Sequence, residues 1–267
     1  MKRLAVLGGG NLGRALALGW VGAGRLKPAD IRVTRRQADK LQDLAALGFQ
    51  TGSDNRAAIR DADVVVIAVQ PQQLDDLLAE IGRELEPERH RLISVVTGVS
   101  IAQIRAAVGC EVPLVLAMPN TAVQIGESMT CLAAGPGSEA ALEEARELFD
   151  LVGRTLVIQE EMMAPATALC ACGVAFFLRC VRAASQGGIE IGFHPEEALL
   201  LAAQTARGAA SLTLRDNSHP EGEIDRVTTP RGCTIAGLNE MEHRGLSSAM
   251  IKGLIVSARA AERLYQD

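Results

Sequence analysis

The chain has 267 residues, 48% of them hydrophobic and 22% charged, which is the balance of a soluble globular protein with one large domain or two ordinary ones. A net charge of −5 without a dense Lys/Arg run argues against nucleic acid as a partner, and aromatic residues at 3% offer few platforms for stacked bases. The six cysteines lack metal-ligand spacing and Met1-Lys2-Arg3 shows no signal peptide, so we predict no metal site, free thiols and a cytoplasmic protein.

A glycine-rich turn lies between the first predicted strand, residues 3–7, and a helical stretch, residues 14–21. The turn has the pattern G-x-G-x-x-G and consists of Gly8, Gly9, Gly10, Asn11, Leu12 and Gly13. The first motif glycine allows the tight turn, the second lets the backbone approach a pyrophosphate, and the third lets the helix pack closely on the strand. Because the helix start offers free amides and a positive dipole end to phosphates, we predict a dinucleotide site here.

The end of the second predicted strand, residues 30–34, indicates which dinucleotide binds. NAD sites place an acidic residue there, about 20 residues past the glycine turn, to bind the ribose hydroxyls. This chain has Thr34-Arg35-Arg36 instead. A hydroxyl and two guanidinium groups suit a 2′-phosphate, to which arginine makes charge-assisted bonds, although a solvated basic loop is the alternative. We predict NADPH as the cofactor, with NADH possible.

Strand and helix patterns alternate through residues 1–160. Helices are predicted at residues 37–47, 74–85 and 138–151 and after Ser100, and further strands at residues 64–69, 92–97, 114–118, 128–134 and 155–158. Residues 64–69 are a continuous apolar run, typical of a central parallel strand buried on both faces. We therefore predict an α/β fold in which residues 1–160 form a Rossmann domain with a doubly wound parallel sheet.

From residue 161 to residue 267 the strand pattern stops, and helices are predicted at residues 164–186, 195–214, 234–244 and 247–265. A helical domain this apolar would expose a large hydrophobic surface in a monomer. We therefore expect it to form a subunit interface. The uncharged segment 162–178 approaches the length of a membrane span. It contains Pro165 and Gly173 and follows acidic rather than basic residues, so we expect a helix buried on all sides and no membrane partner.

The side chains available for acid catalysis restrict the reaction. An enzyme that reduces a carbonyl usually supplies a His, Lys or Tyr acid to the developing alkoxide. No lysine lies between Lys40 and Lys252, the one tyrosine is Tyr265, and we expect the four histidines at the surface: His90, His194, His219 and His243. A protonated C=N bond is already positive and accepts hydride through positioning and charge stabilisation, so the composition favours imine reduction.

Four motifs in order make the chain resemble Δ1-pyrroline-5-carboxylate reductase over essentially its whole length. They are the glycine turn, Ala68-Val69-Gln70-Pro71, Met118-Pro119-Asn120-Thr121, and the stretch Val227 to Leu238, which contains Thr229-Pro230-Arg231-Gly232-Cys233-Thr234. The resemblance implies reduction of 1-pyrroline-5-carboxylate to L-proline by NAD(P)H, the last step of proline biosynthesis. It also implies a helical domain that interlocks with a second copy, in dimers that often assemble further.

The resemblance implies roles for particular residues. Asn55, Ala68, Val69 and Pro71 would line the cofactor, and Asn120 and Thr121 would lie near the nicotinamide. The loop of Thr229, Arg231, Gly232 and Cys233 would hold the substrate, with Thr234 as the hydroxyl closest to the imine. A turn before a helix start does offer free amides to a carboxylate. The alternative is that Thr234 only caps its helix.

The chain also departs from the family. Cys170-Ala171-Cys172-Gly173-Val174-Ala175-Phe176 stands where the family commonly has Ser-Gly-Ser-Gly-Pro-Ala-Tyr, Arg231 replaces a glycine, and Gln70 replaces a lysine. The loss of the serines and the tyrosine removes polar contacts that the helix would offer the substrate, and the added Arg231 cation could replace them. The departures leave a related cyclic imine as an alternative substrate. A β-hydroxyacid dehydrogenase would need a lysine that residues 164–186 lack, and a non-catalytic NADP-sensing regulator would not need the intact loop 229–234.

Overall fold

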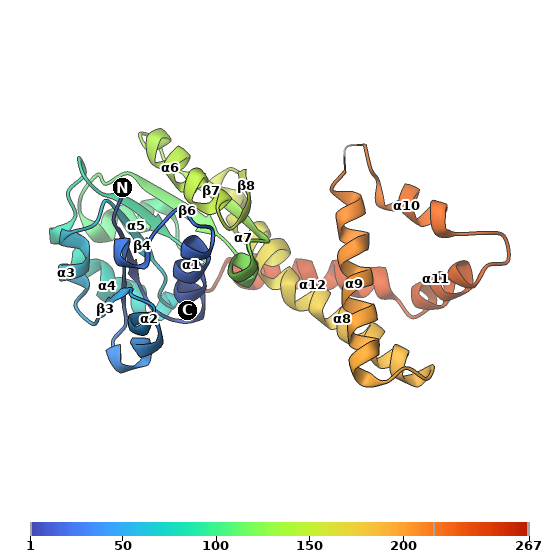
Figure 1. The fold of residues 1–267 in the computed structure, drawn as a ribbon. Coiled ribbons are helices and arrows are strands. Elements are labelled where there is room, and N and C mark those ends of the chain that lie inside the picture. Colours follow the sequence, from blue (N-terminus) through green and yellow to red (C-terminus); the bar gives the residue numbers. More distant parts are fainter. Residues whose placement is uncertain (1, 216, 266–267) are drawn as a thin grey trace. The chain divides into compact units, whose positions relative to one another are not determined.

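The computed structural model describes residues 2–215 and 217–265, which form two compact units (Figure 1). The first unit comprises the chain up to Cys172 together with its last residues from Ser257 on, and the second is Gly173–Val256. This division lies later than the expected end of the first domain at residue 160. Ala166 packs with Met118 of the sheet, and the Tyr265 hydroxyl donates a hydrogen bond to Asp75. Both ends of the helical region therefore belong to the first unit.

The first unit contains an eight-stranded sheet with the order β3-β2-β1-β4-β5-β6-β7-β8. The strands are β1 Leu4–Leu7, β2 Ile31–Thr34, β3 Gln50–Gly52, β4 Val64–Ile67, β5 Arg91–Ser94, β6 Leu114–Met118, β7 Ser128–Ala134 and β8 Gly153–Val157. The predicted doubly wound Rossmann sheet is confirmed, and within it β6 and β7 are the pair that runs antiparallel. Residues 119–127 connect them, which is too short for the crossover that parallel strands need.

Helices cover both faces of this sheet (Figure 1). They are α1 Asn11–Gly22, α2 Gln42–Ala46, α3 Asn55–Arg60, α4 Leu74–Ile81, α5 Ile101–Val108 and α6 Glu139–Asp150. On one face α1, α2 and α6 bury a core in which the rings of Trp20 and Phe149 meet edge to face at 5.8 Å. On the other face α3, α4 and α5 bury a second core. The short elements β3 and α3 were not expected from the sequence.

His90 lies in the core, so its expected surface position is wrong. Its Nδ1 accepts a hydrogen bond from the Glu86 amide at 2.8 Å, and its Nε2 lies 3.2 Å from the Ile59 carbonyl oxygen, to which it donates. The charged residues around it in sequence point to solvent while the ring is fully buried. Burial lowers the pKa of His90 from its ordinary value of 6.5.

We expect the lowered pKa of His90 to make the protein less stable in acid. Between the ordinary value of 6.5 and the lower folded-state pKa, the unfolded chain takes up a proton that the folded chain does not, so the free energy of unfolding falls as the pH decreases. Urea unfolding at neutral pH and at about pH 5.5 measures this loss. In His90→Gln the loss should be smaller, whereas the exposed-site control His243→Gln should behave like the wild type. An equal loss in all three proteins would contradict the prediction.

The second unit is helical, as expected. Its helices are α8 Gly173–Glu190, α9 Pro195–Thr213, α10 Pro220–Val227, α11 Cys233–His243 and α12 Leu246–Ala261, whose last turn belongs to the first unit. In the first unit, α7 Met163–Ala166 and a π-helical segment Thr167–Cys172 precede α8. α8 and α9 pack together around an apolar groove of about 530 Å³ that Phe177, Val181, Leu201 and Ala206 help to line.

Most apolar side chains of the second unit are exposed in the single chain. Phe177 and Leu178 are each 62% exposed in the single chain, so the expected burial of segment 162–178 on all sides requires a second surface. Within the continuous helical stretch Glu160–Glu190, an 18-residue window has a mean hydropathy of 1.7, so this stretch is long and apolar enough to cross a membrane, a criterion that the core helices of soluble proteins also meet. A second protein surface is the other way to cover such residues.

Candidate active site

The first unit has its topological switch point between β1 and β4. In open α/β sheets, ligands bind at this point, outside the carboxyl ends of the strands. Leu7 and Ile67, the last residues of these two strands, are partners in the sheet register. The glycine turn and Ala68-Val69 therefore emerge side by side at the predicted dinucleotide site.

The backbone of the turn leaves no room for side chains at two of its glycines. A Cβ on Gly8, whose φ is +115°, would lie 2.3 Å from the Ala68 carbonyl oxygen, and a Cβ on Gly13 would lie 2.1 Å from the Gly8 carbonyl oxygen. A Cβ on Gly10 would have no described protein atom within 4 Å, so the space in front of it is open to a ligand. Gly10 is also the N-cap of α1, and the first turn of that helix carries no acidic residue. The turn is thus a cradle for phosphate groups.

A cavity of about 550 Å³ opens at this turn. The predicted residues that line it are Gly8, Gly10, Thr34, Arg35, Arg36, Asn55, Ala68 and Val69. Asn11, Leu12 and Gly13 lie in the start of α1 instead, and Pro71 opens a short 3-10 turn after β4. Sequence reasoning missed four lining residues: Gly9, Gln37, Gln70 and Gln73. Gln70 and Gln73 lie three residues apart, directly after the buried strand β4. This spacing could have predicted from the sequence that they line the cavity.

A hydrogen-bond network shapes the wall of the cavity. The buried Thr34 hydroxyl, 1% exposed, donates to Asn55 Oδ1 at 2.6 Å, and Asn55 Nδ2 donates to Glu80 Oε2 at 3.0 Å. Arg35 Nη1 donates to the Gly9 carbonyl at 3.2 Å, and Arg36 is exposed. Because the Thr34 hydroxyl and the Asn55 side chain are hydrogen-bonded to each other, the cationic groups that line the cavity are the guanidinium groups of Arg35 and Arg36.

Asn120 anchors the loop after β6. Its Oδ1 accepts from the Ala122 amide at 2.9 Å, and its Nδ2 donates to the Cys170 carbonyl at 3.1 Å. Thr121, the next residue, is exposed and begins the 3-10 helix Thr121–Ile125. Asn120 therefore connects this loop to the π-helical segment, and its place near the nicotinamide stays a prediction.

The predicted substrate loop lies in the second unit. The Gly232 amide donates to the Thr229 carbonyl at 2.9 Å, which closes the turn before α11. Arg231 has a φ of +60°, the left-handed region in which the family's glycine carries no strain. Gly232 is the N-cap of α11 and Thr234 lies within its first turn, so the alternative that Thr234 is the helix cap is wrong. Both Arg231 and Cys233 are exposed, and Thr234 is half-buried.

Comparisons with known proteins match the whole chain. The family described as pyrroline-5-carboxylate reductase dimerisation covers residues 160–264, and the one described as NADP oxidoreductase coenzyme F420-dependent covers residues 3–98. Pyrroline-5-carboxylate reductase 2 of Dictyostelium discoideum is 47% identical over 98% of this chain and 93% of its own length. Pyrroline-5-carboxylate reductase 1 of that organism is 50% identical over 98% of this chain, which spans 50% of that relative's length.

The chain belongs to the pyrroline-5-carboxylate reductase family. The predicted family, fold class and NAD(P)H-dependent oxidoreductase activity are thereby confirmed, with reduction of pyrroline-5-carboxylate in proline biosynthesis as the reaction. Membership favours this reaction over the β-hydroxyacid dehydrogenase alternative. The dimerisation family also covers the exposed apolar helices and supports self-association.

Solved structures of the family agree with the fold. Pyrroline-5-carboxylate reductase from Coxiella burnetii superposes with a TM-score of 0.88 and 29% identity over 98% of both chains. A Plasmodium falciparum pyrroline carboxylate reductase with NADP bound has a TM-score of 0.90 over 99% of this chain and 98% of its own, and its 23% identity shows the fold alone.

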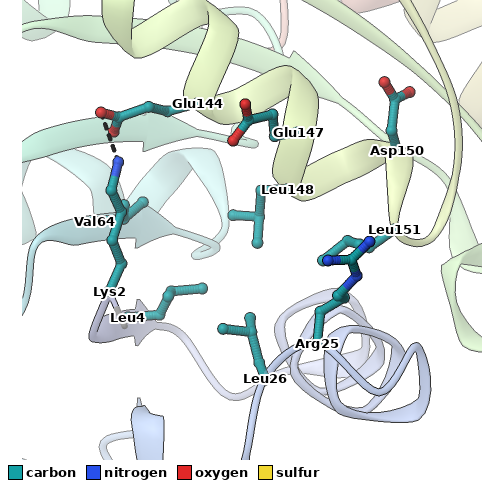
Figure 2. Close-up of a pocket in the computed structure, with 10 residues that line it drawn as sticks. All are labelled: Lys2, Leu4, Arg25, Leu26, Val64, Glu144, Glu147, Leu148, Asp150 and Leu151. Atoms are coloured by element: carbon teal, nitrogen blue, oxygen red, sulfur yellow. Dashed lines mark ion pairs between the residues drawn. The ribbon is translucent and has the colours of Figure 1, made fainter.

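A further cavity of the reductase, about 580 Å³, lies at the amino ends of the strands (Figure 2). Along one side of it, Lys2 forms an ion pair with Glu144, with 2.6 Å between Nζ and Oε1. Glu147 and Asp150 also line it from α6, so phosphate groups would meet carboxylates. Among the described residues that line it there is no glycine cradle, so the switch-point cavity suits a dinucleotide better than this one does.

Proposed function

We propose that NADPH is the preferred hydride donor for the reduction of 1-pyrroline-5-carboxylate to L-proline by this chain, and that it binds in the switch-point cavity. The observation that supports this proposal is that Arg35 and Arg36 line the same cavity as the glycine cradle. Among its described lining residues there is no Asp or Glu, so a 2′-phosphate would meet cations without a competing carboxylate. When bound, the cofactor supplies the hydride.

The protein's own part in the reaction is to bind and orient the substrate. Free amides at the start of α11 and the Arg231 guanidinium would hold the carboxylate. A left-handed φ at Arg231 costs about 1 kcal/mol, and such strain is concentrated at functional sites. The Thr234 hydroxyl would position the imine nitrogen. Because the protonated imine carries its own positive charge, this positioning replaces a strong general acid.

The direct test mixes the purified chain with NADPH and pyrroline-5-carboxylate and follows both nicotinamide oxidation and proline. One proline should form for each NADPH oxidised, and a β-keto acid should not be reduced. NADPH binding without turnover would contradict the proposal and favour the regulator. Turnover with another cyclic imine alone would favour the related reductase.

We also propose that the second unit forms the interface between two or more copies. Light scattering should show a dimer or larger assembly at micromolar concentration, because association removes the exposed side chains of Phe177 and its apolar neighbours from water. Phe177→Glu should shift the assembly toward monomer. Leu47→Glu, at an exposed leucine of the first unit, is the matched control and should not. A stable wild-type monomer would contradict this interface.

The location of the protein and its lack of nucleic acid partners stay predictions. All six cysteines are free in the described part of the chain, which is compatible with a reducing cytoplasm.

A further inference from the structure

Two cysteine side chains from distant parts of the chain meet behind the loop that carries Asn120. The Sγ atoms of Cys131, in β7, and Cys170, in the π-helical segment, are 3.8 Å apart. Cys131 is 4% exposed and Cys170 is half-buried, and both belong to a small apolar cluster with Met118.

The pKa values of the two thiols are shifted in opposite directions. A hydrogen bond from the Cys131 thiol lowers the pKa of Cys170 to about 7, although burial opposes this. The same bond and burial raise the pKa of Cys131 above its usual range. The hydrogen bond therefore favours the thiolate, which is the nucleophilic form, at Cys170 and the protonated thiol at Cys131.

We propose that Cys170 and Cys131 form a peroxide-reactive modification site, in which oxidation joins them as a disulfide that slows turnover. The Cys170 thiolate attacks one oxygen of hydrogen peroxide, the O–O bond breaks, and the leaving hydroxide takes up a proton to become water. The Cys131 sulfur then attacks the resulting sulfenic acid, the S–O bond breaks, and the departing hydroxide takes the Cys131 proton as a second water. The two sulfurs lose two electrons, and the peroxide gains them.

The geometry connects this disulfide to the predicted site. Because a disulfide bond is about 2.0 Å long, the sulfurs must approach by roughly 1.8 Å, and we infer that the π-helical segment shifts toward β7 as the two side chains rotate to meet. The Cys170 carbonyl accepts the 3.1 Å hydrogen bond from Asn120 and moves with that segment. The disulfide would therefore disturb the loop that we place near the nicotinamide. Its effect on turnover rests on the proposed function, whereas its formation does not.

The test treats the reduced protein with hydrogen peroxide, maps disulfides by mass spectrometry and measures turnover before and after dithiothreitol. We expect a crosslinked peptide pair that contains Cys131 and Cys170. Turnover should fall roughly tenfold, the effect of about 1.4 kcal/mol, and recover with dithiothreitol. NADPH affinity should change little, because neither cysteine lines the switch-point cavity.

Two variants isolate the pair. Cys131→Ala removes the second thiol, so neither the crosslink nor a recoverable loss of turnover should occur. Cys180→Ser, at an exposed cysteine of α8, is the matched control and should respond as the wild type does. Three results would each overturn the proposal: no Cys131–Cys170 crosslink, unchanged turnover of the crosslinked protein, or the same recoverable loss in Cys131→Ala. A crosslink in a protein that never reduces pyrroline-5-carboxylate would instead defeat the proposed function and leave the modification site standing.

Discussion

Replacing Arg35 and Arg36 together with alanine should raise the KM for NADPH by roughly a hundredfold or more and leave the KM for NADH within a few-fold. Both guanidinium groups line the cavity of the glycine cradle. The 2′-phosphate is the group that distinguishes the two cofactors, and each charge-assisted bond to it is worth about 1.5–3 kcal/mol. Steady-state kinetics with each cofactor measure the change in preference.

The single variants separate the two arginines. Arg35 also donates to the Gly9 carbonyl at 3.2 Å, so Arg35→Ala should weaken both cofactors somewhat by loosening the turn. Arg36→Ala should weaken NADPH alone. Arg25→Ala, in the cavity at the opposite end of the sheet, is the matched control and should change neither KM. Equal losses for NADPH and NADH in the double variant would show that the two arginines do not bind the 2′-phosphate.

Replacing Thr234 with alanine should lower turnover roughly ten- to a hundredfold and leave NADPH binding almost unchanged. The reason is the loss of one hydrogen bond to a charged group, worth about 1.5–3 kcal/mol, while hydride transfer still proceeds by proximity. Thr234→Ser keeps the hydroxyl and should retain much more activity. Turnover numbers and NADPH titrations measure both effects.

Thermal unfolding distinguishes this role from a structural one. Because Gly232 is the N-cap of α11, Thr234→Ala should change the free energy of unfolding by no more than about 0.5 kcal/mol. Thr228→Ala provides the matched control, since the Thr228 hydroxyl donates to the Ile224 carbonyl at 2.8 Å, a local structural bond. That variant should lose some stability and keep its turnover. A stable Thr234→Ala enzyme with full turnover would remove Thr234 from the catalytic site.

Long and strongly patterned elements were predictable from the sequence, and short ones were not. The apolar run at residues 64–69 correctly predicted a buried central strand, β4, and Ser100 correctly marked the start of α5 with a capping box to Gln103. The three-residue strand β3 and the helix α3 carry too few residues for a period to show. His90 misled for a related reason: its charged neighbours in sequence are exposed, while its own hydrogen bonds to Ile59 and Glu86 satisfy a buried ring.

By itself the sequence determined the local requirements of the site: glycines where a Cβ would collide, arginines in place of an acidic residue, and a turn before α11. These requirements follow from the backbone conformation and the charge of residues that are neighbours in the chain, so they can be predicted from the sequence. Only the tertiary structure decided which distant residues meet, as the side chains of Cys170 and Cys131 do. Such contacts depend on strand order and on helix packing across the sheet, and residues 39 positions apart carry no local pattern that would predict them.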